Sequence, residues 1–438
     1  IKKLLPQGKT TVFKAQLRIL PSVAFISAFL NNTPVVVIFA PIIKHWAKSV
    51  KLPATKFLIP LSYVTILGGI CTLIGTSTNL VVHGMILEAG YEGFTMFELG
   101  KVGIFIAIAG IIYLFIFSKR LLPDARPDTA VPDEEVEEGE KLHRVEAVLG
   151  ARFPGINKKL SDFNFQRHYG AEVKEIKTRN GQRYVDHLED VVLREGDTLV
   201  VMADDTFIPT WGESSVFVLL TNGNDPDTSG KKKRWLALIL LVLMIVGATV
   251  GELPATKEMF PDIKLDMFFF VCITTIIMAW TNIFPARKYT KYISWDILIT
   301  IACAFAISKA MENSGFAALI ARHIIGMSSS MGPYALLAIV FIITNIFTEL
   351  ITNNAAAALS FPIALSVATQ LGVDPTPFFV VICMAASASF STPIGYQTNL
   401  IVQGIGSYKF TDFVKIGLPL NLITFLISVF VIPMIWKF

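Results

Sequence analysis

TLIGTSTNLVVHG, residues 72–84, and TPIGYQTNLIVQG, residues 392–404, are two copies of one short pattern. Eight of the thirteen positions are identical, at a constant offset of 320 residues. Each copy places a Gly, hydroxyl groups and an Asn inside an apolar part of the chain. An unpaired backbone group is costly in hydrocarbon, so each copy predicts a broken helix that lines a cavity or faces protein.

The composition indicates a membrane protein. Of the 438 residues, 53% are hydrophobic and 16% are charged, and the mean hydropathy is +0.58, whereas about a quarter of the residues of a soluble domain are charged. The basic residues form short clusters, so the net charge of +4 reports membrane topology and argues against nucleic acid as a partner. The four cysteines have no CxxC or CxxH spacing, which argues against a zinc site or a disulfide framework. No catalytic residue is predicted, and we do not expect an enzyme.

Apolar runs of about 20 residues, the length that crosses a bilayer, predict plain helices near residues 100–118, 235–253, 265–285, 292–311 and 415–436. Polar residues interrupt the other runs. These predict re-entrant hairpins at 17–48 and 332–370, and broken helices at 54–89 and 376–407. The expected fold class is an α-helical polytopic membrane protein with two repeats, each made of a hairpin, a broken helix and a plain helix.

A change in composition divides the chain into three parts. Residues 1–118 form the first transmembrane repeat, residues 119–233 a soluble insert, and residues 234–438 further membrane helices and the second repeat. The insert opens on a Pro- and Glu-rich linker, and its β-branched runs at 170–178 and 190–205 predict a small α+β unit. Because only the second hairpin is preceded by several apolar segments, we expect additional N-terminal helices ahead of residue 1.

Charged flanks predict the orientation. Lysines bracket the first hairpin on both sides, whereas the flanks of the second, SSSMGP and QLGVDP, contain no Lys or Arg. By the positive-inside rule the first hairpin opens to the cytoplasm and the second to the outside, so the repeats are predicted to be inverted. The basic clusters at 119–120, 231–234, 287–291 and 409–415 place the insert in the cytoplasm.

The polar breaks are the predicted site, because discontinuous helices in an internal repeat indicate the substrate site of a secondary transporter. Free carbonyl and amide oxygens suit Na⁺, and helix N-termini suit an anion. The expected substrate-binding residues are Asn32, Thr33, Ser77, Thr78, Asn79, Asn353, Asn354, Gln397, Thr398 and Asn399. The expected sodium-binding residues are Asn31, Asn32, Gly75, Thr76, Asn79, Thr352, Asn353, Gly395 and Asn399.

The alternative role of such side chains is to hold membrane helices together by hydrogen bonds. Matched spacing favours the site, since Asn32 and Asn79 are 47 residues apart and Asn353 and Asn399 are 46 apart. Glu349, one turn before the second tip, is either a proton or cation ligand or a carboxylate paired within the bundle.

At these residues the chain resembles the divalent anion:sodium symporter family of the ion transporter superfamily. That family carries Ser-Asn-Thr at each hairpin tip and a Thr-Pro-Asn-like motif at each broken helix. Here the tips read NNT and TNN and the breaks read GTSTN and GYQTN, so ligand roles carry over only by position. SAFLNNTPVVVIFAP and the insert are most similar to the sodium/sulfate transporter branch with a TrkA-C domain, whose lobe corresponds to about residues 145–206.

The resemblance implies a sodium-coupled symporter of a small divalent oxyanion, sulfate first, that works by an elevator-type movement in a homodimer of the plasma or cell inner membrane. The TrkA-C-like lobe implies a cytoplasmic ligand. A sodium/dicarboxylate symporter is an alternative, because C4-dicarboxylates fit the same polar breaks. A cation/proton antiporter that uses Glu349 is an alternative of another class, although no second acid lies in the breaks.

Overall fold

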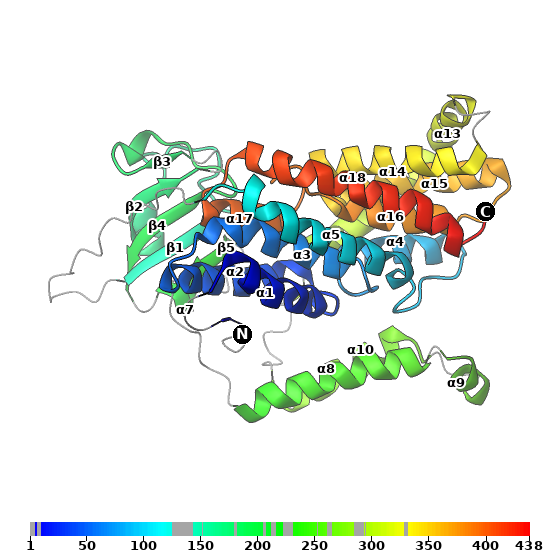
Figure 1. The fold of residues 1–438 in the computed structure, drawn as a ribbon, viewed down its shortest axis with the longest axis horizontal. Coiled ribbons are helices and arrows are strands. Elements are labelled where there is room, and N and C mark those ends of the chain that lie inside the picture. The colour runs from blue at the N-terminus through cyan, green and yellow to red at the C-terminus, as the bar shows by residue number, and fades with distance from the viewer. Residues whose placement is uncertain are drawn as a thin grey trace.

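The computed structural model describes residues 5–6, 10–124, 143–150, 152–178, 182–204, 207–211, 216–221, 231–251, 253–260, 265–283, 293, 295–327 and 332–438. Most of the predicted acidic linker, the NGNDPDTSG stretch and the basic cluster at 287–291 lie outside these residues. A long bundle of helices carries a small sheet at one end (Figure 1).

The first half of the bundle follows the predicted order of elements. A hairpin of α1 (Val12–Ser27) and α2 (Asn32–Ser49) is followed by α3 (Leu58–Gly69), α4 (Ser77–Glu88) and α5 (Gly100–Leu121). Every residue of α3 is buried, because its sequence LIPLSYVTILGG has no charged side chain and packs against α1, α2 and α5. Residues 70–76 separate α3 from α4, so the break begins earlier than the predicted GTST stretch at 75–78 and overlaps it.

The second half repeats this order. The hairpin is α14 (Gly332–Leu350) and α15 (Asn353–Leu371), followed by α16 (Thr376–Ser387), α17 (Gln397–Gly406) and α18 (Phe410–Ile435). Residues 388–396 separate α16 from α17. Between the halves lie α8 (Lys231–Gly251), α9 (Pro254–Met259), α10 (Met267–Trp280), α12 (Trp295–Asn313) and α13 (Phe316–Met327). Figure 1 shows α8 and α10 as a pair beside the bundle.

Apolar surface indicates that the bundle lies in a membrane. Among the described residues, four helices are long and apolar enough to cross a bilayer, namely α5, α14, α15 and α18. Ile104, Ile108, Ile112 and Ile116 are each about half exposed and recur at every fourth position of α5, so they form one apolar stripe. Such a stripe is unfavourable in water and suits lipid.

The corresponding helices α5 and α18 run antiparallel. Tyr113 in the middle of α5 donates to the carbonyl of Ile416 near the start of α18 (2.9 Å). Trp436, just after the end of α18, donates to Glu98, just before the start of α5 (3.3 Å). The bundle therefore contains two similar halves whose last helices point in opposite directions.

The two hairpins open at opposite ends of the bundle. In the first, Lys44 near the end of α2 pairs with Glu146 of the sheet (3.1 Å). In the second, Tyr334 at the start of α14 packs its ring on Phe438 (5.4 Å between centroids), beyond the end of α18. Figure 1 places the sheet at the left end of the bundle and the C-terminus at the right end.

The insert contains the predicted α+β unit. Its antiparallel sheet has the strand order β3-β2-β4-β1-β5. The strands are β1 (His143–Leu149), β2 (Glu172–Lys177), β3 (Arg183–Tyr184), β4 (Thr198–Ala203) and β5 (Phe217–Thr221), with the short helices α6 (Phe165–Tyr169) and α7 (Phe207–Trp211). Gly196 supplies a left-handed residue (φ +84°) in the turn before β4, a conformation that Gly adopts without steric cost. The sheet continues through β5, so the unit extends beyond residue 206, the predicted end of the lobe.

Charge fixes the insert on the first hairpin. Burial by itself raises the pKa of Glu146, but the charges of Lys44 and Lys177 outweigh it, so that the pKa of this carboxyl falls to about 2. The insert also touches α17: a Cβ at Gly196 would lie 3.3 Å from Leu400, and one at Gly404 would lie 2.5 Å from Thr198 Oγ1. The insert thus contacts both a hairpin and a broken helix.

Candidate functional site

Side-chain hydrogen bonds hold the first broken helix open. Thr72 Oγ1 donates to the carbonyl of Ala28 in the hairpin and accepts from the backbone N–H of Gly75 (3.1 Å). Asn79 Nδ2, in the first turn of α4, donates to the carbonyl of Thr72 (2.9 Å). Backbone groups that the break would leave unpaired are therefore satisfied by neighbouring side chains.

The second broken helix has the same bonds. Thr392 Oγ1 donates to the carbonyl of Glu349 (3.1 Å) and accepts from the N–H of Gly395 (3.3 Å). Asn399 Nδ2 donates to the carbonyl of Thr392 (3.1 Å). Each group lies 320 or 321 positions after its counterpart, so the sequence copies share one local geometry.

The hairpin tips are also equivalent. Ser27 Oγ donates to Asn32 Oδ1 (2.8 Å) in the first tip, and Thr348 Oγ1 donates to Asn353 Oδ1 (2.7 Å) in the second. Both asparagines are buried and begin the second helix of their hairpin. In each hairpin, the hydroxyl group five residues before the Asn therefore orients the tip.

Each broken helix meets the hairpin of the other half. Ser77 Oγ and Thr78 Oγ1 both donate to Asn354 Oδ1 (3.2 Å each). Thr33 Oγ1 donates to Gln397 Oε1 (3.4 Å). Because α4 packs on α15 and α17 packs on α2, the structure brings most of the predicted substrate residues into one region between the halves.

Tyr396 connects the two halves at this region. Its hydroxyl accepts from Asn32 Nδ2 and lies 3.1 Å from Thr76 Oγ1, and it also interacts with Asn353. Tyr396 is buried and stands at the position that Thr76 occupies in the first copy. Tyr396 lies within the GYQTN motif, but the sequence predicted no role for it.

Asn79 and Asn399, the asparagines that follow the two breaks, differ in the hydrogen bonding of the side-chain oxygen Oδ1. Asn399 Oδ1 accepts from Ser62 Oγ of α3 (2.7 Å), and Ser62 Oγ lies 2.8 Å from Thr398 Oγ1. Asn79 Oδ1 is buried and has no hydrogen-bond partner within the part of the chain that the structure describes. An unpartnered buried oxygen is costly, so Asn79 offers a free ligand.

Asn31 and Thr352 occupy the N-cap positions of α2 and α15. Thr352 Oγ1 accepts from the N–H of Ala355 (3.4 Å) at the start of α15, which gives it a local role. Asn31 occupies the same place before α2 and makes no side-chain cap bond. Of these two predicted sodium ligands, Asn31 is the one whose side chain is not used by its helix.

The two break glycines are required by space. A Cβ at Gly75 would overlap the carbonyl oxygen of Gly69 and lie 2.7 Å from its Cα. A Cβ at Gly395 would overlap Ser389 Oγ and lie 2.5 Å from the carbonyl oxygen of Thr348. The predicted open backbone at both positions is therefore closely packed against a neighbouring segment.

The sequence prediction missed several supporting residues, although a signal existed for most of them. Thr72 and Thr392 lie inside the repeated pattern, and Ser27 and Thr348 are both hydroxyl residues 321 positions apart. Ser62 has no such signal, since residues 377–386 of α16 contain no hydroxyl group. The supporting residues missed are Ser27, Ser62, Thr72, Thr348, Thr392 and Tyr396.

The assembled groups are neutral. The helices α2, α4, α15 and α17 begin at Asn32, Ser77, Asn353 and Gln397, and their N-termini carry partial positive charge that suits an anion. The stretches 31–33, 75–79, 352–354 and 395–399 contain no Lys or Arg. Among the described residues no group of three His, Cys, Asp or Glu could hold a metal, so a cation here would be bound by neutral oxygens.

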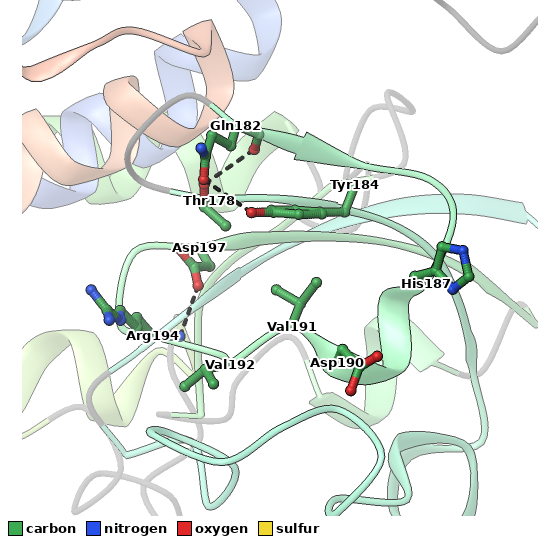
Figure 2. Close-up of a pocket in the computed structure, with 9 residues that line it drawn as sticks. All are labelled: Thr178, Gln182, Tyr184, His187, Asp190, Val191, Val192, Arg194 and Asp197. Carbon is green, nitrogen blue, oxygen red and sulfur yellow. Dashed lines mark hydrogen bonds between the residues drawn. The ribbon is translucent and has the colours of Figure 1, made fainter.

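The insert has a pocket of its own. It encloses about 360 Å³ between β3 and the segment before β4. Figure 2 shows the Tyr184 ring on one side and Val191 on the other. Asp197 Oδ2 accepts from the N–H of Arg194 (2.7 Å) and fixes the adjoining turn. The lining residues are Thr178, Gln182, Tyr184, His187, Asp190, Val191, Val192, Arg194 and Asp197.

A comparison with known families identifies the chain. The family model described as "Citrate transporter" matches residues 1–261 and 259–438, so this protein belongs to the citrate transporter family of membrane transporters.

Named relatives agree with a transporter. An uncharacterized transporter of Synechocystis is 30% identical over 94% of this chain and 81% of its own length. Sodium/sulfate cotransporter 2 of Chlamydomonas reinhardtii is 30% identical over 66% of this chain and 32% of its own length. Solute carrier family 13 member 4 of Homo sapiens is 27% identical over 34% of this chain and 23% of its own length. The predicted resemblance to sodium/sulfate transporters is supported at this level, and the TrkA-C assignment stays a prediction.

Proposed function

We propose that this protein is a sodium-coupled symporter of a small divalent oxyanion, most simply sulfate, in the plasma or cell inner membrane. The observation that carries the proposal is the meeting of two broken helices and two hairpin tips, with four helix N-termini and no cationic side chain. A site of this kind holds an anion by dipoles, amides and hydroxyls, and co-bound cations supply the missing positive charge. The relatives named sodium/sulfate cotransporters support the same substrate pair.

The proposed sodium sites lie at the two breaks. Asn79 Oδ1, which is buried without a hydrogen-bond partner among the described residues, is the strongest ligand candidate. Asn31, Asn32, Gly75 and Thr76 complete the first site in this proposal. The second uses Thr352, Asn353, Gly395 and Asn399, where Ser62 already occupies the Asn399 oxygen.

The proposed mechanism is an elevator-type alternation between two inverted repeats. The antiparallel α5 and α18 and the opposite openings of the hairpins support the inversion. In this proposal the hairpins are re-entrant, the insert is cytoplasmic, and the carrier works as a homodimer.

Single cysteines in a cysteine-free background test the topology: Gly372→Cys should react with an impermeant reagent from outside intact cells, and Lys48→Cys should not. Labelling of both from outside would contradict the inversion.

Uptake into proteoliposomes tests the transport proposal. Labelled sulfate should accumulate when Na⁺ is present outside, and replacement of Na⁺ by choline should abolish accumulation. Empty liposomes are the control for leakage. Equal uptake of labelled sulfate in both cations would contradict sodium coupling. If excess unlabelled sulfate did not reduce the sodium-driven uptake of label, a saturable sulfate site would be contradicted.

A sodium/carboxylate symporter is the second candidate, because the matching family model is described as a citrate transporter. C4-dicarboxylates such as succinate fit the same polar groups, and cavity length would separate them from sulfate. Succinate and citrate should therefore be tested as competitors and as labelled substrates. A cation/proton antiporter that uses Glu349 would exchange Na⁺ for protons with no anion present, which a pH-sensitive dye inside the same liposomes would detect.

The insert is proposed to regulate transport through a cytoplasmic ligand. Its pocket includes Arg194 and Asp197, and Gly196 between them lies against Leu400 of α17. A ligand can bias the carrier only if it binds its alternative states unequally. Replacement of residues 143–221 by a flexible linker should leave sodium-dependent uptake measurable but change its rate. Complete loss of uptake in a deletion that still inserts into the membrane would contradict the regulatory role.

A further inference from the structure

Glu349 has a side chain that the bonds shared by the two halves do not use. Its Oε1 accepts from the backbone N–H of Ser391 (2.8 Å) and from Asn421 Nδ2 of α18 (2.7 Å). Asn421 Nδ2 also donates to Ser391 Oγ (2.8 Å). The carboxyl is therefore fixed between α18 and the loop of the second break.

Two oxygen atoms of this group are buried without a partner in the described part of the chain. They are Oε2 of Glu349 and Oδ1 of Asn421. When Glu349 is ionised both are acceptors, so neither can satisfy the other. A buried acceptor left unpaired costs about 1–3 kcal/mol, and an ionised carboxylate without a counter-charge costs more.

Among the described residues, the two helices that pack most extensively on α14 supply no counter-charge. Among the described residues Glu349 forms no ion pair, and the adjacent helices α15 and α16 contain no charged residue. Tyr63 of α3 interacts electrostatically with Glu349, and its hydroxyl donates to the carbonyl of Phe390 (2.5 Å). The other charged or titratable side chains on α13 and α18, which also pack against α14, are Arg322, His323, Asp412 and Lys415.

We propose that Glu349 is a proton-binding site whose protonated carboxyl forms a paired hydrogen bond with the Asn421 amide. Oε2–H donates to Asn421 Oδ1, while Oε1 keeps the existing bond from Asn421 Nδ2. One proton thereby gives both unpartnered oxygens a bond and removes the buried charge. Sodium fits less well, because the atoms that already contact Oε1 are N–H donors, which repel a cation.

The proposed proton site at Glu349 is present in the second half only. The position that corresponds to Glu349 in the first half is Ala28, whose carbonyl accepts from Thr72 as that of Glu349 accepts from Thr392. The carboxyl additionally binds the loop through the N–H of Ser391. Proton binding at Glu349 therefore changes the charge beside the second break, and the first break has no equivalent group.

Infrared difference spectroscopy of the full chain in liposomes tests the proposal, and it does not depend on the transport function. Wild type should show the carbonyl band of a protonated carboxyl group that disappears reversibly as the pH is raised. Glu349→Gln should lose this band, and Glu98→Gln, which alters another partly buried carboxylate, should keep it. Glu349→Gln is isosteric and can donate to Asn421 Oδ1, so we expect it to fold.

A second variant keeps the test informative if Glu349→Gln does not fold. Asn421→Leu leaves Glu349 in place and removes its partner, so the band should persist at a higher frequency because its hydrogen bond is lost. A band that is unchanged in both Glu349→Gln and Asn421→Leu would overturn the proposal. Disappearance of the band when sodium chloride replaces choline chloride at constant pH would show a sodium ligand, and would overturn it equally.

Discussion

The two broken helices have the same architecture but different chemistry. In both, a Thr bridges the hairpin carbonyl and a Gly N–H, and an Asn returns to the carbonyl of that Thr. The first break leaves Asn79 Oδ1 without a partner, whereas in the second Ser62 binds Asn399 Oδ1. The repeated residues therefore build the loop, and the unrepeated neighbours decide which oxygens remain free for a ligand.

The largest effect is expected at the residues that the two breaks share. Gly75→Ala and Gly395→Ala each force a Cβ into neighbouring backbone, which should destabilise the fold by about 3 kcal/mol or more. The thermal unfolding temperature of the purified protein measures this. Gly326→Ala is the matched control, because a Cβ there would meet no atom within 4 Å. If only one of the two variants lowers the unfolding temperature, the two breaks are not equivalent in packing.

The next prediction separates the two asparagines. Asn399→Ala removes bonds to Ser62, Ser389 and Thr392, so it should lower stability by about 2 kcal/mol whether or not sodium is present. Asn79→Ala should mainly weaken sodium binding, by about tenfold for each 1.4 kcal/mol of lost coordination.

Thermal unfolding at increasing sodium concentration distinguishes these two outcomes. The stabilisation by sodium should shrink in Asn79→Ala and be retained in larger part by Asn399→Ala. If both variants respond to sodium as the wild type does, the amide oxygens serve packing alone.

A smaller effect is expected where the halves join. Tyr396→Phe keeps the ring but removes the hydroxyl that meets Asn32 and Thr76. It removes the acceptor of Asn32 Nδ2, at a cost of about 1–2 kcal/mol. Thr76→Val, which removes one of these bonds from the other side, should cost less than Tyr396→Phe. A double mutant whose effect equals the sum of the two would contradict direct coupling through this hydroxyl.

The smallest effects are expected for the reciprocal contacts between broken helix and hairpin. The pairs Thr33–Gln397 and Ser77–Asn354 have long hydrogen bonds (3.4 and 3.2 Å), of which the first is exposed and the second is partly buried. Thr33→Val and Ser77→Ala should therefore each change stability by no more than about 0.5 kcal/mol. In the proposed function both should still raise the substrate concentration needed for half-maximal uptake. Unchanged uptake kinetics in both variants would remove these hydroxyls from the substrate site.

The sequence predicted both breaks and most of the helices, whereas α9 and α13 lie in no predicted range. Polar residues within apolar runs predicted breaks at GTST and PIGYQ, because such residues interrupt a membrane helix only where protein satisfies the backbone. In the structure both breaks begin earlier, and they leave residues 70–76 and 388–396 outside the helices. The offset of 320 residues also predicted that both halves contain the same elements. Most of the predicted site residues gather where the halves meet, since the repeated pattern marks both sides of that contact.

The hydrogen-bond partner of each polar atom depends on how the helices pack. Ser62 and Asn399 are separated by 337 residues, and Asn32 and Tyr396 by 364, so no local pattern relates them. Helix packing brought the hydroxyl of Ser62 to one Asn and left the other with a free oxygen. It also placed Asn421 against Glu349, because burial forces polar groups to pair with whichever donors the fold brings within reach.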